Sequence, residues 1–517
     1  MKPTTRFDLR CAPRERRLRG SLSLTQLALA LVTLAACGSS DGAAPWRGER
    51  GPYGSVVLPA EPQDPGDPAA GRAMLLNGGY MTCGIPYKIV GNPLLAPFLG
   101  SFGSGKTIEG REGHNRRMPY SMNAFTAPNG AEVVNSNCLT CHGGEFDGNL
   151  YVGLGNAAAD WTNTLPALDL PDSLLDLLGL SDAEKANLQR MLSASRALTQ
   201  TRMRTVGNNP AEIVAVVLMA HHDRDTLAWS DELRAPLEPR DEHGNRMSLD
   251  DARVTSDPPP WWRAHKKNAL FYNGMARGDH RGTMALATSV CVDDVEQARR
   301  VDGMFKDMQT YIGTLLAPHY TRGIDRDLAG QGRAVFLARC ANCHGTYAAD
   351  PDDDASDTYP NLLFPLDVIG TDPVVANAGV IHAPELVEWY NGSFYGRITR
   401  MTPADPFPGY MAPPLDGIWA TAPYFHNGSV PTVELVLNSE ARPRHWKRVD
   451  YDSTHFDEDA LGWPWVEVPY GQADAPDGER KHVYDTTYWS QSNAGHTFGD
   501  RLTSNERRAV IEYLKTL

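Results

Sequence analysis

Two short segments of the chain place cysteine and histidine at a spacing that attaches haem. Residues 138–142 read Cys-Leu-Thr-Cys-His and residues 340–344 read Cys-Ala-Asn-Cys-His, so both fit CxxCH. Two thiols three positions apart lie on one helical turn, where they bond to the two vinyl groups of one porphyrin, and the next histidine ligates the iron. A structural zinc site or a redox-active thiol pair is the alternative for a single copy, whereas two copies predict two covalently attached c-type haems. The predicted attachment and proximal-ligand residues are Cys138, Cys141, His142, Cys340, Cys343 and His344.

The sixth ligand of each iron decides between electron transfer and the binding of dioxygen or peroxide. For the second haem the candidates are His496 and His426, with Met401 and Met411 less favoured. For the first haem, the spacing of residues along the sequence does not distinguish among the candidates. An iron without a sixth ligand from the protein is an equal alternative. The first-haem candidates are His114, Met118, Met122, His221 and His222.

Two further clusters of side chains have a functional and a structural interpretation. The aromatic residues Trp261, Trp262, Phe271 and Tyr272 alternate with lysines, and they form either the wall of a distal haem pocket or a packing segment, which we favour. An acidic run offers carboxylates to calcium, although a solvated loop is the favoured interpretation. The acidic residues are Asp350, Asp352, Asp353, Asp354 and Asp357.

The first 36 residues have the features of an export signal. Seven basic side chains precede an apolar run that ends in Leu-Ala-Ala-Cys-Gly, with Cys37 as the cysteine. The run is shorter than the roughly 20 residues that span a bilayer, and its end resembles a lipoprotein cleavage site. We expect a lipoprotein signal peptide over residues 1–36, lipid on Cys37 and a flexible tether over residues 37–70. These features predict that the protein is anchored at the periplasmic side of a bacterial membrane, and we expect the outer membrane. The alternative to lipidation is an ordinary signal peptide or a simple membrane anchor.

Two cysteines remain after the haem and lipid cysteines are assigned. They are Cys83 and Cys291, since Cys11 lies in the signal segment. An oxidising compartment favours a disulfide between them, and two buried free thiols are the alternative.

Helical patterns outnumber strand patterns in the rest of the chain. Apolar residues recur every four positions before Cys340, and Thr-Ser-Asn-Glu at 503–506 is a capping box that begins a last helix. The stretches 174–192 and 211–221 are also helical. We predict a mainly α fold with long irregular loops, a haem domain over residues 71–324 and a second over residues 325–517. No internal repeat is found beyond the haem motifs, and the net charge of −14 argues against nucleic-acid binding.

One segment resembles a known family. Residues 422–429 read Ala-Pro-Tyr-Phe-His-Asn-Gly-Ser, within a longer likeness over residues 412–439 to the bacterial di-haem cytochrome c peroxidase superfamily. The nearest branch is the larger enzymes related to rubber oxygenase, which residues 133–143, 259–274 and 493–499 also resemble.

The resemblance implies two cytochrome c-like domains around an interface between the haems. It makes His142 and His344 proximal ligands, His496 the sixth ligand of the second haem, and His426 a neighbour of that haem. It implies an open first haem, with Trp261, Trp262 or Phe271 in its distal pocket.

From these features we expect a di-haem c-type oxidoreductase. The first haem activates hydrogen peroxide or dioxygen, and the second relays electrons from a small redox protein or another electron donor. The alternative is an electron-transfer cytochrome in which both irons have six ligands and there is no substrate.

Overall fold

The computed structural model describes residues 49–92, 95, 105–162, 172–210, 212–234, 240–241, 243, 245–248, 253–402 and 407–517. The predicted signal peptide and the predicted lipidation site, Cys37, lie outside these residues. From Gly48 onward the chain forms one compact unit. None of the described helices is long and apolar enough to cross a membrane.

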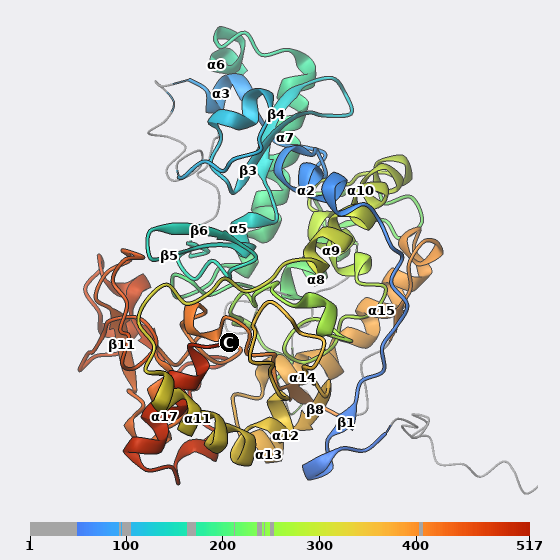
Figure 1. Ribbon diagram of the computed structural model, residues 1–517. Helices are drawn as coiled ribbons and strands as arrows, with labels where there is room; N and C mark the ends of the chain where they lie inside the picture. Colours follow the sequence, from blue (N-terminus) through green and yellow to red (C-terminus); the bar gives the residue numbers. More distant parts are fainter. Residues whose placement is uncertain are drawn as a thin grey trace, which may run out of the picture. The chain divides into compact units, whose positions relative to one another are not determined.

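Helices and short strands are interspersed along the described chain, with no regular succession of one strand and one helix (Figure 1). The described helices are α2 (Pro68–Asn77), α3 (Tyr87–Val90), α5 (Leu139–His142), α6 (Asp172–Leu177), α7 (Asp182–Leu198), α8 (Glu212–His221), α9 (Arg281–Thr288), α10 (Val295–Gly313), α11 (Arg326–Arg339), α12 (Ala341–His344), α13 (Leu366–Ile369), α14 (Val374–Ile381), α15 (Ala383–Gly392), α16 (Val433–Val436) and α17 (Ser504–Leu514). The described strands are β1 (Val56–Val57), β2 (Ile85–Pro86), β3 (Met122–Thr126), β4 (Glu132–Ser136), β5 (Gly143–Phe146), β6 (Asn149–Val152), β7 (Arg277–Gly278), β8 (Leu362–Pro365), β9 (Met401–Thr402), β10 (Gly409–Met411), β11 (His445–Arg448), β12 (Trp465–Glu467) and β13 (Tyr484–Asp485).

The fold is mixed and not mainly α, which corrects the sequence prediction. Within the described residues the strands form small antiparallel sheets, with orders β1-β8-β10, β12-β11-β13, β2-β4-β3, β5-β6 and β7-β9. Most of these strands have two to four residues. An alternating pattern needs a longer run to be recognised, so the sequence carried little strand signal.

The α11–α17 pair supports the second CxxCH segment (Figure 1). The predicted capping box is confirmed, because the Thr503 side chain accepts from the Glu506 backbone while Glu506 bonds back to Thr503. The two helices touch at Gly332, where a Cβ atom would lie 1.8 Å from the carbonyl oxygen of Ala509. Glycine is therefore needed for this close crossing, which fixes the helix that leads to Cys340.

The α2–α10 pair has the same construction in the first half of the chain. Here the crossing occurs at Gly71, where a Cβ atom would lie 2.0 Å from the carbonyl oxygen of Asp307. Both glycines begin the same tripeptide, Gly-Arg-Ala, at 71–73 and at 332–334. In the first half, however, β2, β3 and β4 intervene before the CxxCH segment, whereas α11 leads to its cysteine directly.

The predicted tether is packed from residue 49 onward. Val56 and Leu58 are buried, and β1 pairs antiparallel with β8, with Val56 opposite Leu363. Asp67 then caps α2, the helix that packs on α10. The Pro and Gly content of this segment suggested a flexible tether. The packing could not be predicted, because a two-residue strand that pairs with a distant strand leaves no local periodicity in the sequence.

The hydrophobic cores do not follow the predicted division near residue 325. The core around α2, α9 and α10 also contains Leu386 and Tyr390 from α15. The core around α11 and α17 contains Phe146 from β5 and Trp262. Each predicted domain thus completes its core with side chains from the other.

The helical stretches predicted at 174–192 and 211–221 are present, with one interruption. A break at Gly179, which has φ of 66°, separates α6 from α7, and a capping box between Ser181 and Glu184 restarts the helix. The second stretch is α8.

Candidate functional site

The first CxxCH segment forms α5, a single helical turn whose histidine is oriented by a proline carbonyl. His142 Nδ1 donates to the carbonyl oxygen of Pro259 at 3.1 Å, which leaves Nε2 as the nitrogen able to bind a metal. Burial lowers the pKa of His142 to about 4, so the imidazole is neutral, as a ligand must be. Burial also raises the pKa of Cys138 to about 11 and of Cys141 to about 12, and both are free cysteines.

The second CxxCH segment forms α12 and repeats this arrangement. His344 Nδ1 donates to the carbonyl oxygen of Pro413 at 3.0 Å, and burial lowers the pKa of the ring. Cys340 and Cys343 are free, and burial raises the pKa of each thiol to about 11. Each candidate proximal histidine therefore has a fixed ring, a neutral charge and an available Nε2.

The two prolines begin loops that repeat each other at an offset of 154 residues. Residues 259–274 and 413–428 both read Pro-Pro, then ten residues, then Phe-x-Asn-Gly. Their backbones agree as well: Phe271 and Phe425 have φ of 63° and 72°, and each is followed by a glycine with positive φ. A short 3-10 helix occupies the same place in each, Ala264–Lys266 and Ile418–Ala420. The expectation that no internal repeat exists beyond the haem motifs is therefore wrong, because matching residues and matching backbone conformations recur in the two loops.

The repeated loops meet through a reciprocal pair of backbone hydrogen bonds. The Met411 amide donates to the carbonyl oxygen of Tyr272 at 2.8 Å, and the Asp257 amide donates to that of His426 at 2.7 Å. Met411 and Asp257 are equivalent by the offset of 154, as are His426 and Tyr272. Contacts of this kind relate two equivalent units by an approximate twofold axis.

His496 faces His344 at the distance that one metal ion between them requires. Their ring centroids are 6.4 Å apart, with the planes inclined by 63°. A metal–imidazole nitrogen bond is about 2 Å long, so two ligands on opposite sides of one ion have ring centres about 6 Å apart. Burial, with His344 and Arg442 nearby, lowers the pKa of His496 to about 4, which keeps the ring neutral.

Arg442 holds the loop that carries His496. Its guanidinium donates to the carbonyl oxygens of Asn493 at 2.7 Å, Gly495 at 2.6 Å and His496 at 3.3 Å. It also donates to two carbonyls near α16 and lies 4.8 Å from the ring centroid of Phe425. His496 itself has φ of 47°, a left-handed conformation that these bonds maintain.

His426 is engaged elsewhere and does not face His344. Its ring stacks on Tyr410 at 4.2 Å, and its Nε2 lies 3.0 Å from the Tyr410 hydroxyl. Burial lowers the pKa of His426 to about 3. Met401 and Met411, the less favoured candidates, lie in β9 and β10 on the cavity wall described below.

The three histidine candidates for the sixth ligand of the first centre have other partners. His114 stacks on Tyr87 at 4.0 Å. His221 Nδ1 bonds to the Ser230 carbonyl and its ring stacks on Trp229 at 4.9 Å, while its Nε2 is buried without a partner. His222 uses both ring nitrogens, on the carbonyls of Leu218 and Val292.

The methionine candidates Met118 and Met122 are buried in one cluster, and of the two Met122 lines the cavity. Within the described residues, no ring contact pairs His142 with a second histidine as His344 is paired with His496.

The aromatic candidates for the distal pocket separate into different places. Trp261 stacks on the His142 ring, with centroids 4.4 Å apart, so it lies on the proximal side. Trp262 is buried in the core around α17, and its indole nitrogen donates to the Val152 carbonyl. Phe271 lines the cavity and remains the candidate that fits the prediction.

Both CxxCH segments open onto one cavity of about 1390 Å³. It exceeds the roughly 300–1,000 Å³ of a site for one drug-sized ligand. Most of its wall is apolar, but several buried polar atoms in the wall have no hydrogen-bond partner. These atoms are Trp161 Nε1, Asp257 Oδ1, His280 Nε2, Thr283 Oγ1, Gln309 Oε1 and Thr371 Oγ1. A flat apolar ligand with polar groups at its edge satisfies both properties, so the cavity fits haem.

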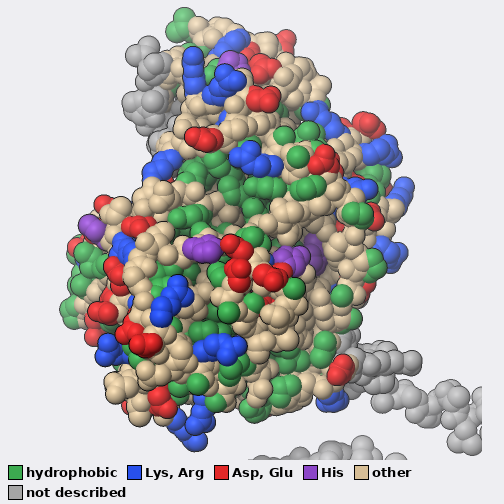
Figure 2. Space-filling view, in the orientation of Figure 1, with side chains coloured by type: hydrophobic (Ala, Val, Ile, Leu, Met, Phe, Trp, Pro, Cys, Tyr) green, Lys and Arg blue, Asp and Glu red, His purple; other side chains and the backbone are tan. Residues whose placement is uncertain are grey.

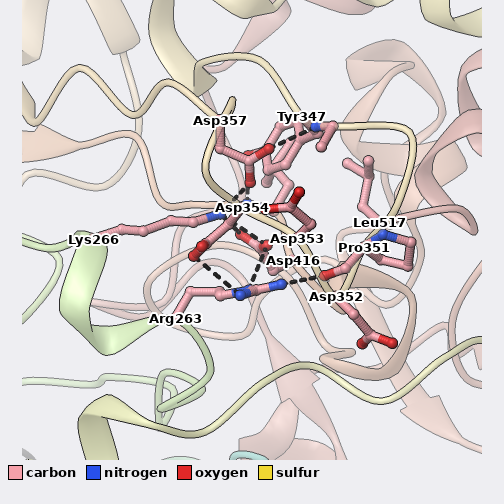
Figure 3. A network of polar contacts seen from close by, with 12 residues as sticks. Arg263, Lys266, Tyr347, Pro351, Asp352, Asp353, Asp354, Asp357, Asp416 and Leu517 are labelled. Atoms are coloured by element: carbon pink, nitrogen blue, oxygen red, sulfur yellow. Dashed lines mark hydrogen bonds and ion pairs between the residues drawn. The ribbon is translucent and has the colours of Figure 1, made fainter.

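The acidic run binds basic side chains of the first repeated loop (Figure 3). Arg263, which is 3% exposed, contacts Asp354 at 3.0 Å and Asp416 at 3.3 Å. Lys266 contacts Asp357 at 2.6 Å and Asp416 at 3.0 Å. Across the described ranges, no cluster of three or more histidine, cysteine or acidic side chains is arranged to hold a metal ion. Asp416 thus ties the two repeated loops together, and Asp354 and Asp357 tie the acidic run to the first of them. Asp350, Asp352 and Asp353 are exposed, as the predicted solvated loop requires.

Figure 2 shows acidic side chains beside histidines at the middle of one face, below a band of hydrophobic side chains. Two histidines outside the candidate centres contact the acidic run: His265 bonds to Asp354 at 2.7 Å, and His319 to Asp352 at 3.1 Å.

Cys83 and Cys291 form a disulfide with an S–S distance of 2.10 Å. It joins the segment before β2 to the turn between α9 and α10. Neighbouring Asn135 donates to the Cys83 carbonyl and lines the cavity.

Comparison with known proteins places the second repeated loop within a recognised family pattern. Residues 409–447 match the family described as RoxA-like, cytochrome c-like. Over 254 residues the chain is 29% identical to the uncharacterised protein y4iJ of Sinorhizobium fredii, a match that covers 38% of this chain and 39% of that protein. It is 31% identical over 160 residues to the uncharacterised protein y4iM of the same organism, which covers 26% and 34% of the two chains. The chain therefore spans less than half the length of these relatives, and the matched segment supports a cytochrome c-like region with c-type haem.

Proposed function

We propose that the chain is a di-haem c-type oxidoreductase with two unlike centres. Cys138, Cys141 and His142 would hold the first haem, and Cys340, Cys343 and His344 the second. The observation that carries the proposal is the repeated unit of CxxCH turn, proline-anchored histidine and Phe-x-Asn-Gly loop. The cytochrome c-like family match covers the second loop alone.

The second centre would transfer electrons. His344 and His496 supply two neutral imidazoles at the separation for one ion, and Arg442 holds the second of them in place. A haem iron held by both His344 and His496 would have no position left for a substrate.

The first centre would react with dioxygen or hydrogen peroxide. His142 would supply one imidazole from the cavity wall, whereas His114, His221 and His222 are not among the residues that line the cavity. Phe271, on the cavity wall, is an apolar side chain suited to a pocket that excludes water. A c-type haem bound at His142 supplies an iron that can take up oxygen or peroxide at its free side.

The expected setting follows from the same proposal. Electrons would come from a small redox protein or another donor, and the signal peptide with Cys37 would anchor the protein at the periplasmic side of the membrane. The expectation of no nucleic-acid partner stands on the net charge of −14.

Haem content and spin state test the proposal. A pyridine haemochrome assay on the purified protein is expected to give two c-type haems per chain, and electron paramagnetic resonance one low-spin and one high-spin ferric signal. Carbon monoxide is expected to bind one reduced haem. Two low-spin haems that do not bind carbon monoxide would instead establish the electron-transfer cytochrome.

Variants of the two histidine candidates test the ligand assignment. His496→Ala is expected to convert the low-spin signal to high spin, because one of two axial imidazoles is lost. His426→Ala is the control and is expected to keep the low-spin signal. The opposite pattern would exchange the roles of the two residues.

A further inference from the structure

Lys267 is a partly buried cation on the cavity wall that forms no ion pair with a described acidic side chain. It lies in the first repeated loop, and its ammonium donates to the Pro260 carbonyl at 3.4 Å. No ion pair joins it to a carboxylate of the described chain. Its neighbour Lys266 differs, because Asp357 and Asp416 neutralise it. The charge of Lys267 is therefore left to face the cavity.

Two neighbouring carbonyls place Lys267 beside the first centre. Its ammonium donates to the Pro260 carbonyl, and His142 donates to the carbonyl of the adjacent Pro259. Burial lowers the pKa of Lys267 itself to about 8, against the opposing attraction of Asp416. A lysine in this state gains from a carboxylate that reaches it.

The wall of the same cavity offers two further hydrogen-bonding groups. His280, which precedes α9, and Thr283, within α9, both line the cavity. His280 Nε2 and the Thr283 hydroxyl are buried without partners. Both atoms can donate a hydrogen bond to an anion. Lys267, His280 and Thr283 would therefore all favour a negatively charged ligand.

The second half lacks this cation. By the offset of 154 residues, the position of Lys267 corresponds to Thr421, which also lines the cavity. The Thr421 hydroxyl bonds to the Ile418 carbonyl. The cation is thus a property of the first centre and not of the repeated loop.

We propose that Lys267, with His280 and Thr283, binds a carboxylate inside the cavity beside the first centre. The proposal rests on the proposed function, because it takes His142 as the ligand of a haem. Two sources have this chemistry: a propionate of that haem, or a free organic acid that enters as a substrate. The ammonium supplies the charge, and the imidazole and hydroxyl supply directional hydrogen bonds.

The test compares Lys267→Met, Lys267→Arg and Thr283→Val with the wild-type holoprotein. Lys306→Met is the matched control, because Lys306 is exposed on α10. The reduction potential of the high-spin haem is measured by spectroelectrochemistry, and the binding of octanoate by calorimetry.

The two sources give different results. If a propionate binds Lys267, Lys267→Met lowers the potential, since an unneutralised carboxylate favours ferric iron; Lys267→Arg restores it, and octanoate does not bind. If a free acid binds, octanoate binds the wild type and Lys267→Met weakens that binding about tenfold or more. Thr283→Val, which removes a hydroxyl while keeping the size of the side chain, weakens the same property by a smaller factor.

The proposal is overturned if Lys267→Met and Thr283→Val both leave the potential and octanoate binding equal to those of Lys306→Met. The haemochrome assay separates this failure from that of the proposed function. Fewer than two haems per chain contradict the proposed function, whereas two haems with no effect of Lys267 contradict the carboxylate site alone.

Discussion

At the scale of single residues, the two candidate centres differ in what each histidine faces. His344 has a second imidazole across from it, while His142 has Trp261 stacked on its own side. The ring that faces His344 is held by a residue far from both CxxCH segments in sequence. Arg442 therefore holds the backbone that carries the ring facing His344.

Replacing Arg442 is expected to change the spin state of the second haem. In Arg442→Gln the carbonyls of Asn493, Gly495 and His496 lose their donor, so the left-handed backbone at His496 relaxes and part of the low-spin signal becomes high spin. Electron paramagnetic resonance at low temperature measures the ratio.

Arg480→Gln is the control for Arg442→Gln, because Arg480 is exposed and pairs with Asp477. If Arg442→Gln lowers thermal stability but leaves the spin ratio unchanged, Arg442 has a structural role alone.

The sequence could predict the residues whose chemistry depends on close spacing. The two cysteines and the histidine of CxxCH lie within five positions, so their geometry follows from one helical turn. The bonds from His142 to Pro259 and from His344 to Pro413 span 117 and 69 residues, and no local pattern reports them. The repeated Pro-Pro and Phe-x-Asn-Gly pairs were the available signal for these bonds.

At the scale of elements, two helix crossings depend on a glycine each. Gly332→Ala is expected to destabilise the protein by about 1–3 kcal/mol, because its Cβ would overlap the Ala509 carbonyl. Gly330→Ala is the control within the same helix, since nothing lies within 4 Å of its added Cβ, and it is expected to be neutral or stabilising by about 0.4–1 kcal/mol. Urea unfolding of both variants checks the difference; equal effects would show that the crossing tolerates a methyl group.

The connection between the acidic run and the first repeated loop is expected to weaken in acid. Burial tends to raise the pKa of Asp354, but the bond from His265 and the charge of Arg263 outweigh it and hold that pKa below 3.8. A carboxyl with a lowered folded pKa stabilises the fold above its ordinary value, and this stabilisation is lost as pH falls through the folded pKa.

Asp354→Asn tests this pH dependence. The variant is expected to lose about 1 kcal/mol at pH 6 and to approach the wild type as the pH falls below 3.8, as measured by urea unfolding. Asp353→Asn, one residue away, is the control for the position. If Asp354→Asn is less stable than the wild type by the same amount at acid pH as at pH 6, the charge of the Asp354 carboxylate does not cause the difference.

The helices could be predicted better than the sheets for a physical reason. The capping box at Thr503 and the apolar spacing of α11 are local, and both were found in the sequence. By contrast, β1 has only two residues and pairs with β8, which lies about 300 residues later in the chain. Strands this short show no alternation of apolar and polar residues from which they could be predicted.

At the scale of the whole molecule, the disulfide joins Cys83 to Cys291 across a separation of 208 residues. Its removal in the Cys83→Ser, Cys291→Ser double variant is expected to lower stability by about 2–5 kcal/mol, because the unfolded chain regains freedom. Thermal unfolding with and without a reductant measures the effect. A reductant that lowers the melting temperature of the double variant as much as that of the wild type would contradict it.

The shared cores make the two predicted domains interdependent. Leu386 and Tyr390 complete the core around α2 and α10, and Phe146 and Trp262 complete the core around α17. A chain ending at residue 324 lacks part of the first core although it contains the first CxxCH segment. The sequence suggested two domains because the CxxCH motifs that begin at Cys138 and Cys340 lie 202 residues apart, but motif spacing does not show which core the later helices join.

The reciprocal bonds between Tyr272 and Met411 and between Asp257 and His426 resemble the contact of a symmetric dimer whose two subunits are fused. In a homodimer every substitution appears at both sites, so the sites stay alike. In a fused pair each copy varies alone, which is how one half carries Lys267 where the other has Thr421, and how His344 alone faces a histidine such as His496. Fusion thus permits a division of labour that an assembly of identical subunits cannot achieve.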